Sequence, residues 1–256
     1  MMREKQLYDV IVPMTKDNLP VFQMNIQYIR KNLDCKRVIV IGAEGLREDS
    51  LRLGAEFLNE DEVCEGMTLG AVKAYMTERT GKASRSGWYF QQFLKFGYSY
   101  LCEDEYYIVW DSDTVPLHPI SHIQNGKPVF TKKEEMEPPY FETLDRLFAG
   151  EVKKYGDFSF ICENMIFSVA VGGSFWERIL SAVSDENLPG SGFSEFETYG
   201  NYVMKYHPGM YELRTLRGLR KGAEFFGTAP TEAQLQWAAK SYDTIAFERW
   251  SHSRKW

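Results

Sequence analysis

The chain has 256 residues, of which 44% are hydrophobic and 26% charged, a balance that supports a buried core and excludes a disordered chain. Its 30 Lys and Arg against 36 Asp and Glu give a net charge of −6, which disfavours a general nucleic-acid binder. An anionic small molecule stays compatible with this charge, because a cationic pocket can exist on an acidic protein. The length predicts one large domain or two closely fused halves.

The four cysteines are too widely spaced for a clustered zinc site or a dense disulfide framework, so we expect reduced thiols. They are Cys35, Cys64, Cys102 and Cys162. Asp9 and Pro13 interrupt the apolar run near the N-terminus, which is too short for a signal sequence. No stretch approaches the roughly 20 apolar residues of a membrane span. We therefore expect a cytoplasmic protein, with peripheral attachment to the inner face of a membrane left open.

Short β-branched runs alternate with amphipathic segments through the first 115 residues. The expected strands are 8–14, 37–41 and 106–110, and the expected helices are 18–32, 68–77 and 86–102. Asp17 or Asn18 is the candidate cap of the first helix, and Pro20 lies in its first turn. Alternation of this kind predicts a mainly parallel sheet covered by helices.

The second half of the chain is less regular. We expect strands at 158–161, 165–169 and 244–247 and helices at 174–184, 194–206 and 231–240. The charge run 132–139 ends in two prolines and predicts a solvated loop, with a mobile loop beside a site as the alternative. The spacing of four basic residues predicts a solvated helical face, with phosphate contact as the alternative; they are Arg214, Arg217, Arg220 and Lys221. No repeat and no linker divides the chain, so we expect a single domain over 1–256.

The most informative motif is Asp111-Ser112-Asp113, which directly follows the apolar run 106–110. Ligands of open α/β sheets bind beyond the carboxyl ends of the strands, and residues i and i+2 of an extended chain face the same side. Both carboxylates could therefore hold one Mg²⁺ or Mn²⁺ ion, with phosphate oxygens completing its shell. Such an ion would neutralise charge on a diphosphate leaving group. The plainer interpretation is a polar turn that closes a strand.

Other phosphate-binding motifs fit less well. Gly81-Lys82 is followed by Ala83 and lacks the first glycine of a P-loop, and the turn at 42–45 is not a dinucleotide fingerprint. The motif at Asp111 also matches the nucleophile motif of haloacid-dehalogenase-like phosphatases. There it normally follows the first strand, whereas 110 residues precede Asp111 here, and no second acidic pair follows at 156–161. A phosphatase with Asp111 as nucleophile remains an alternative, as does a non-catalytic sugar-nucleotide-binding protein.

Four segments in this order resemble glycosyltransferases of the GT-A fold, in particular a poorly characterised family of bacterial glycosyltransferase-like proteins. They are YDVIVPMTKDN at 8–18, GWYFQQFLKF at 87–96, YYIVWDSDTVPL at 106–117 and SEFETYGNY at 194–202. The resemblance implies an α/β fold, a single GT-A domain with a mixed, mainly parallel central sheet flanked by helices. It further implies a nucleotide-binding half over 1–115 and an acceptor-side half over 116–256.

The same resemblance implies transfer of a sugar from a nucleotide diphosphate donor, commonly uridine-linked, to a saccharide or other hydroxyl acceptor. The acceptor could be lipid-linked, and surface polysaccharide assembly is the pathway suggested by analogy. The ion, Mn²⁺ or Mg²⁺, would lie at Asp111 and Asp113, with His252 from the C-terminal tail as a further ligand. Donor-binding residues would be Pro13, Thr15, Arg85, Gln92 and Ser112, together with the two aspartates. Donor sugar, stereochemical outcome and oligomeric state are left open.

A second carboxylate motif begins at Ser194. The spacing of Ser194 and Glu197 matches a capping box, which explains Glu197 structurally. Glu195 then stands at a helix start with no structural role, where an acid could act as general base toward an acceptor hydroxyl. We therefore expect Glu195 as the catalytic carboxylate and Glu197 as the second choice. Arg85 stands just before the helix expected at 86–102, where free backbone N–H groups favour an anion. The plainer interpretation is a solvated arginine that precedes an N-cap at Ser86.

Overall fold

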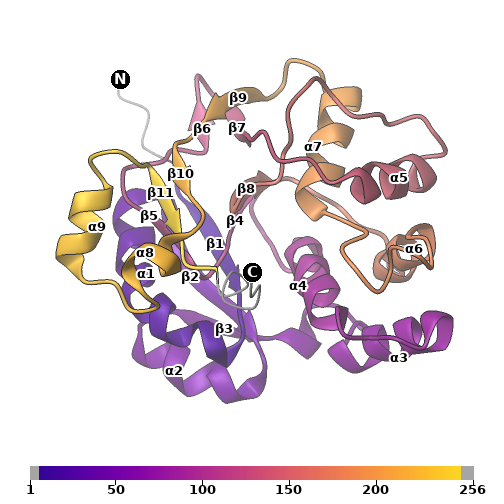
Figure 1. Cartoon of the computed structure of the whole chain (residues 1–256), viewed down its shortest axis with the longest axis horizontal. Helices are drawn as coiled ribbons and strands as arrows, with labels where there is room; N and C mark the ends of the chain where they lie inside the picture. Colours follow the sequence, from indigo (N-terminus) through magenta and orange to yellow (C-terminus); the bar gives the residue numbers. More distant parts are fainter. Residues whose placement is uncertain (1–5, 249–256) are drawn as a thin grey trace.

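Residues 6–248 of the computed structural model are described, and a five-stranded sheet runs through their centre (Figure 1). Its order is β3-β2-β1-β4-β8. The strands are β1 Tyr8–Pro13, β2 Cys35–Gly42, β3 Glu56–Asn59, β4 Tyr107–Trp110 and β8 Asn164–Phe167. All neighbours pair in parallel except β8, which is antiparallel to β4. The expected α/β fold with a mixed, mainly parallel sheet is confirmed.

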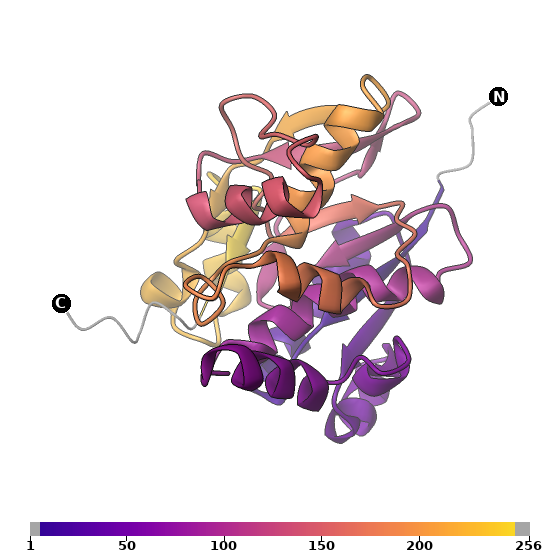
Figure 2. The ribbon, with the colours of Figure 1, turned by 90° about the vertical axis from the view of Figure 1, so that its right-hand side faces the viewer.

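Helices cover both faces of this sheet. They are α1 Leu19–Asn32, α2 Arg47–Arg52, α3 Leu69–Thr80, α4 Ser86–Gly97, α5 Pro138–Leu147, α6 Phe175–Ala182 and α7 Glu195–Tyr206. Helix α1 lies on one side of the sheet and α4 on the other, while α5 and α7 lie above α4 and α6 (Figure 2). Because both faces are covered, β1 and β4 are buried along their whole length, and both are apolar apart from Asp9 on β1.

Two smaller sheets complete the structure. One has the order β10-β11-β5, with β5 Thr114–Pro116, β10 Gly218–Leu219 and β11 Thr244–Ala246. The other has the order β6-β7-β9, with β6 Ile123–Gln124, β7 Lys127–Lys132 and β9 Glu212–Thr215. The short helices α8 Gly222–Phe226 and α9 Glu232–Ala238 pack beside the first of these sheets. Strand β11 pairs antiparallel with β5, so the last described residues return to the acidic turn that precedes β5.

Several expected elements differ from the structure. Residues 158–161 form no strand, because only Ser159 bridges to Lys133 there. The basic segment 214–221 is not helical, since it contributes to β9 and β10. The prolines at 138 and 139 open α5 rather than closing a loop, as their fixed φ suits a first helical turn. The long helix expected at 86–102 ends at Gly97, where a Cβ would approach Val63 Cγ1 to 2.8 Å, and continues as a 3-10 turn, Tyr98–Tyr100.

The sequence led us to expect reduced cysteines and no membrane-spanning helix. All four cysteines are free thiols, as expected. Between residues 6 and 248, no helix is long and apolar enough to cross a membrane.

A buried carboxylate, Asp9, links the central strand β1 to β2 and to the turn after α4. Asp9, on β1, is 1% exposed and accepts hydrogen bonds from Arg37 Nε at 2.8 Å, Arg37 Nη2 at 2.9 Å and the Tyr98 hydroxyl at 2.6 Å. Burial alone would raise the pKa of Asp9, but the hydrogen bonds from Arg37 and Tyr98 and the charge of Arg37 outweigh it. The pKa of Asp9 therefore lies below its ordinary value.

A lowered pKa in the folded state makes stability depend on pH. The contribution of Asp9 is fully present above its unfolded pKa of about 3.9 and is lost as the pH falls through the lower folded value. We expect Asp9→Asn to cost about 1–3 kcal/mol at pH 7 and to weaken the loss of stability in acid. Urea unfolding from pH 7 to pH 3 measures this, and an unchanged acid slope in the variant would contradict the assignment.

Candidate active site

The acidic pair lies at the carboxyl end of β4, in the position expected, but its backbone is a turn. Thr114 N donates to Asp111 O at 3.1 Å, so the expected extended conformation of 111–113 is wrong. Helix α1 and the turn before it hold this segment: Asn18 Nδ2 donates to Ser112 Oγ at 2.6 Å, and Asn25 Nδ2 donates to Ser112 O at 3.0 Å. The buried Ser112 therefore fixes the backbone of the turn between the two carboxylates.

Asp113 is a carboxylate in an unfavourable electrostatic environment. Burial, together with the negative charges of Asp111, Glu248 and Glu163, raises the pKa of Asp113 to about 7. The Phe247 backbone N–H donates to Asp113 O at 2.9 Å, so the end of β11 is fixed against this residue. A cation bound beside Asp113 would reduce the repulsion between its carboxylate and those of Asp111, Glu163 and Glu248.

The sequence analysis missed the residue at the centre of the site, Lys95. Its Nζ donates to Asp111 Oδ1 at 2.8 Å and to Glu195 Oε1 at 2.6 Å, and it lies 4.4 Å from the centre of the Phe196 ring. Burial alone would lower the pKa of Lys95, but the charges and hydrogen bonds of Asp111 and Glu195 raise it above the ordinary value. The ammonium group is therefore charged, and it joins α4, the acidic turn and α7. In the sequence, Lys95 falls with Gln91, Gln92 and Ser99 on the polar face of this helix, so no local pattern marked it as buried.

Glu195 occupies the first position of α7 and is 3% exposed. Its backbone N–H donates to Gln92 Oε1 at 3.1 Å, which connects it to α4 a second time. Burial raises the pKa of Glu195, and Lys95 opposes this shift without cancelling it, because one ammonium group serves two carboxylates. The carboxylate also lies within electrostatic range of Asp111.

Glu197 has a different environment two residues further on. Ser194 Oγ accepts from Glu197 N at 3.2 Å, as the capping pattern predicted, but the Glu197 carboxylate does not return to Ser194. It accepts instead from the Ser159 hydroxyl, from Phe160 N at 3.0 Å and from Asn201 Nδ2 at 2.8 Å. These contacts hold the loop before β8 against α7 and leave Glu197 saturated with donors.

A second ionic cluster, also missed from the sequence, lies beside the acidic turn. Glu163 is 8% exposed, and its backbone O accepts from Asp111 N at 2.9 Å. Lys133 Nζ lies 3.1 Å from Glu163 Oε2, and Arg220 Nε lies 3.7 Å from Glu163 Oε1. Arg220 also pairs with Glu135 and, at 2.7 Å, with Glu248. One guanidinium therefore links three chain segments around the turn, which the helical interpretation of 214–221 had obscured.

The structure separates the residues expected to bind the donor. Gln91 Nε2 donates to Pro13 O at 3.2 Å. Thr15 occupies the N-cap position of a short 3-10 helix, Lys16–Asn18, without a hydrogen bond from its side chain. Asn18 at the end of that helix donates to Ser112. Pro13 and Thr15 thus lie on the chain segment joined to the acidic turn, and Gln92 is joined to Glu195.

Arg85 points toward a different part of the molecule. It donates to Ser191 Oγ at 2.7 Å and lies 4.6 Å over the Trp88 ring. The expected Ser86 cap is not formed, because the residue before the first turn of α4 is Arg85 and no side chain caps the helix. His252 lies outside the described residues, which end at Glu248.

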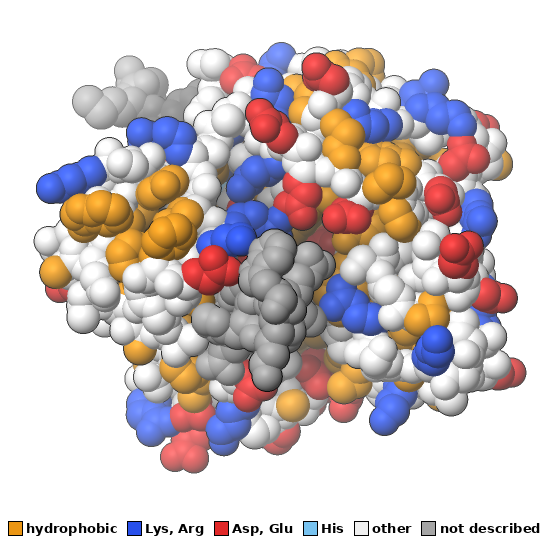
Figure 3. Space-filling model, viewed as in Figure 1, with side chains coloured by type: hydrophobic (Ala, Val, Ile, Leu, Met, Phe, Trp, Pro, Cys, Tyr) orange, Lys and Arg blue, Asp and Glu red, His pale blue; other side chains and the backbone are white. Residues whose placement is uncertain are grey.

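The acidic turn fits a divalent cation with few protein ligands. Across residues 6–248, no three His, Cys, Asp or Glu side chains are arranged to hold a metal ion. Asp111 and Asp113 nonetheless offer hard oxygen ligands, and the carboxylates around them outnumber the ammonium and guanidinium groups of Lys95, Lys133 and Arg220. Figure 3 shows acidic and basic side chains crowded around the hollowed centre of this face. Such a donor set, with water or phosphate oxygens completing the shell, suits Mg²⁺ or Mn²⁺.

Comparison with known proteins places these features in context. A model of a family described as of unknown function, DUF6492, matches residues 56–157, a region that includes α3, α4, β4 and the acidic turn. No curated protein matches the sequence.

Solved glycosyltransferases are similar to the chain in structure. Mouse xyloside xylosyltransferase 1 in its apo form has 12% identity and a TM-score of 0.44, over 95% of this chain and 98% of its own. Apo GlyE of Streptococcus pneumoniae TIGR4 has 8% identity and a TM-score of 0.48, over 96% of this chain and 55% of its own. The bifunctional glycosyltransferase WbbM has 11% identity and a TM-score of 0.42, over 96% and 46%. The chain thus spans about half the length of the last two proteins, and its chemistry has to follow from its own side chains.

The buried bridge at Lys95 yields a prediction about stability. Lys95→Met removes the ammonium group that faces the buried Glu195 and the partly exposed Asp111, and should destabilise the fold by about 3–5 kcal/mol because Glu195 is left as an unpaired buried charge. Lys36→Met is the matched control, because Lys36 pairs with Asp104 at the surface and its loss should change stability far less than the loss of Lys95. Urea unfolding of both variants at pH 7 tests this. Equal effects would contradict a central role for Lys95.

Proposed function

We propose that the protein is a metal-dependent glycosyltransferase of the GT-A type that uses a nucleotide diphosphate sugar, with a UDP-sugar as the preferred donor. The observation that carries the proposal is the acidic turn at the carboxyl end of β4, joined through Lys95 to Glu195 at the start of α7. Two carboxylates that could bind a cation and a separate carboxylate thus lie close together at the carboxyl end of β4, the end of an α/β sheet at which ligands generally bind. Similarity to solved glycosyltransferases agrees with this proposal.

On the donor side, Asp111 and Asp113 would hold Mn²⁺ or Mg²⁺, which supplies charge neutralisation to a departing diphosphate. Ser112 would keep the turn in shape through its bonds to α1 and the turn before it. Pro13, Thr15 and Gln92 would contact the nucleotide and sugar, and Arg85 would contribute positive charge from the other side. His252 stays a candidate for a further metal ligand.

On the acceptor side, Glu195 would take the proton of the attacking hydroxyl. A raised pKa brings its basicity closer to the range useful at neutral pH, and the hydrogen bond from Lys95 fixes one of its oxygens. Glu197 is the second choice, because its oxygens already accept three hydrogen bonds. A base at Glu195 implies inversion at the anomeric carbon. The acceptor would be a saccharide, free or lipid-linked, in surface polysaccharide synthesis on the cytoplasmic side.

Donor binding can be tested by thermal shift with UDP in the presence and absence of Mn²⁺. At UDP concentrations about 100 times the dissociation constant, the stabilisation of about 2.7 kcal/mol should raise Tm by roughly 5 °C or more, and only with the metal. Asp113→Asn should abolish this response. Asp61→Asn, at an exposed position, should keep it.

The alternatives give different results in the same assays. A phosphatase with Asp111 as nucleophile would release phosphate from simple phosphomonoesters and form an aspartyl phosphate. A non-catalytic sugar-nucleotide-binding protein would show the metal-dependent shift without turnover of the donor. A response to no nucleotide, or a shift that persists in Asp113→Asn, would overturn the proposed function.

The role of Glu195 can be separated from that of Glu197 by paired amide variants. Glu195→Gln should lower kcat by about 10²–10⁴-fold while the UDP and Mn²⁺ response is retained. Glu197→Gln should mainly lower stability, because it weakens the clamp on Ser159 and Phe160. Rates of UDP release and urea unfolding of both variants distinguish the two roles, and the reverse pattern would transfer the base to Glu197.

A further inference from the structure

Two aromatic side chains on the short helices α8 and α9 are the most exposed large hydrophobic groups among residues 6–248. Phe225 is 67% exposed and Trp237 is 62% exposed. Phe226 contacts both, with its ring centroid 6.4 Å from that of Phe225 and 6.0 Å from that of Trp237. These three rings form one apolar surface, which we call the aromatic patch. Contiguous apolar groups of this kind on a protein surface mark sites of interaction.

The core beneath the two helices does not need the outer rings of this patch. The inner sides of α8 and α9 pack on β5 and β11 through Ala223, Leu235 and Ala238, each at most 3% exposed. Phe225 and Trp237 lie on the same helices but face outward, and only Phe226 packs partly against the core. The two outer rings therefore remain available for burial by a partner, which would remove apolar surface from water.

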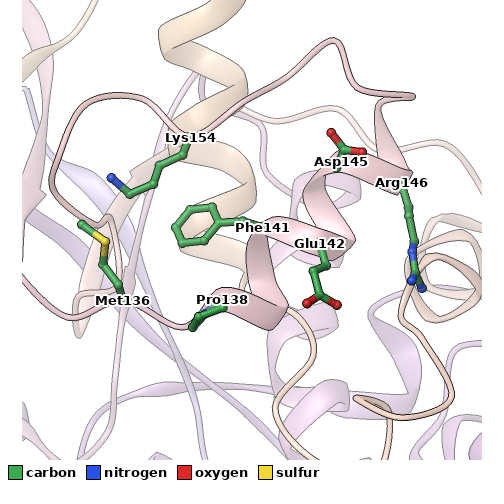
Figure 4. A pocket seen from close by; sticks show the side chains of 7 residues that line it. All are labelled: Met136, Pro138, Phe141, Glu142, Asp145, Arg146 and Lys154. Carbon is green, nitrogen blue, oxygen red and sulfur yellow. The ribbon is translucent and has the colours of Figure 1, made fainter.

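A surface cavity of about 570 Å³ beside α5 differs from the aromatic patch, because its carboxylates already have partners. Figure 4 shows the Phe141 ring at one end of this cavity and two carboxylates of α5 at the other. Glu142 accepts a hydrogen bond from Asn187 Nδ2 at 2.9 Å, and Asp145 pairs with Lys153. The mostly exposed rings of the aromatic patch are thus the stronger candidate for a binding surface.

The aromatic patch opens on the same face of the molecule as the candidate active site. Figure 3 shows hydrophobic side chains grouped over α8 and α9, to the left of the hollowed centre, with lysine and arginine side chains beside them. Strand β11 follows α9, and Phe247 at its end donates its backbone N–H to Asp113 O. A broad surface that covers the patch would therefore lie beside the acidic turn.

The chain around the patch is basic although the protein as a whole is acidic. The last 40 residues, 217–256, hold seven Lys and Arg against four Asp and Glu, a net charge of +3, whereas the whole chain carries −6. Exposed Lys221 directly precedes α8, and exposed Lys240 closely follows α9. The helices themselves carry Glu224, which lies 3.7 Å from Lys221, and Glu232. The excess of positive charge thus comes from the flanking segments, and it matches an anionic surface.

We propose that the aromatic patch docks on an anionic lipid surface, with Phe225 and Trp237 inserted among the headgroups and Lys221 and Lys240 facing the lipid phosphates. Aromatic side chains are enriched where lipid meets water, and basic residues near the membrane are attracted to anionic headgroups. This inference goes beyond the proposed function and does not depend on it, because neither donor nor metal contacts the patch. A lipid surface held there would place a lipid-linked acceptor near the acidic turn.

Charge disfavours a second copy of the chain as the occupant. A closed dimer contact brings the same surface of both subunits together. It would set Lys221 and Lys240 of one subunit near those of the other, and like charges brought together at an interface destabilise it. An anionic lipid surface meets no such repulsion.

The test is co-sedimentation of the full-length protein with vesicles of phosphatidylglycerol and phosphatidylethanolamine in equal parts, and with phosphatidylcholine vesicles. The wild type should bind the anionic vesicles about tenfold or more tightly than phosphatidylcholine, and less tightly as the salt concentration rises. Phe225→Ser combined with Trp237→Ser should lower the affinity for anionic vesicles by about tenfold or more, because both rings are lost. Leu51→Ser is the matched control, since this side chain is 57% exposed on α2, outside the patch.

Charge variants test the second half of the surface. Lys221→Gln combined with Lys240→Gln should weaken binding to the anionic vesicles by about tenfold or more and leave the weaker binding to phosphatidylcholine unchanged. Both double variants change exposed side chains, so they should keep the Tm of the wild type and its response to UDP and Mn²⁺. Loss of lipid docking and loss of donor binding are therefore measured separately.

Three results would overturn the inference. The first is a wild type that sediments with neither kind of vesicle, or equally with both. The second is a ring variant that binds anionic vesicles like Leu51→Ser. The third comes from analytical ultracentrifugation without lipid: a wild-type dimer that becomes a monomer in the ring variant would show that a second copy covers the patch.

Discussion

One buried ammonium group holds the centre of this protein together. Lys95 lies between Asp111 and Glu195, two carboxylates contributed by elements that are far apart in the sequence. Two acids near one another in a low-dielectric interior repel, and each would be unstable there alone. The lysine makes their proximity tolerable and at the same time leaves the neighbouring Asp113 without a comparable cation among residues 6–248. Positive charge from Lys95 thus offsets the charges of Asp111 and Glu195, whereas in the described part of the chain no comparable positive charge offsets that of Asp113.

The sheet topology explains why such a cluster can form. The parallel order β2-β1-β4 brings the ends of β1 and β4 to one edge, where the turn around Asn18 meets Ser112. The antiparallel β8 then places Glu163 next to Asp111 through a backbone hydrogen bond. Arg220 closes the group from a third direction by pairing with acids on three segments. Lys95 and Glu195 are placed by helices packed on the sheet and Asp111 by the end of β4, whereas Glu135, Glu163, Arg220 and Glu248 come from turns and loops beside the strands.

Local patterns in the sequence predicted most of the first half of the fold, but not α2 or β3. Apolar runs and amphipathic spacing between residues 8 and 110 predicted β1, β2, β4, α1, α3 and α4, and the position of Asp111 after β4 followed from them. The short strands β5, β9 and β10 were missed, because their pairing partners lie far along the chain and no local periodicity marks them. The hairpin of β6 and β7 was also missed, although the Asn125-Gly126 pair between them is a strong local turn signal. Lys95, Glu163 and Arg220 escaped because their ionic partners are distant in the sequence. A charged residue gains its role from a partner that only the tertiary structure supplies, as Lys95 does from Glu195.

The pairing of β11 with β5 has a consequence for how the chain tolerates change. Three ladder positions, from Thr244 with Pro116 to Ala246 with Thr114, set the register that delivers the Phe247 amide to Asp113. A strand has a period of two residues, so deletion of a single residue within 244–247 would turn every following side chain to the opposite face. Insertions in the irregular segment between α8 and α9 would leave that ladder intact. The length of the segment 244–247 therefore fixes which backbone amide reaches Asp113. The electrostatic environment of the acidic turn depends on that length more than on which residues occupy the segment.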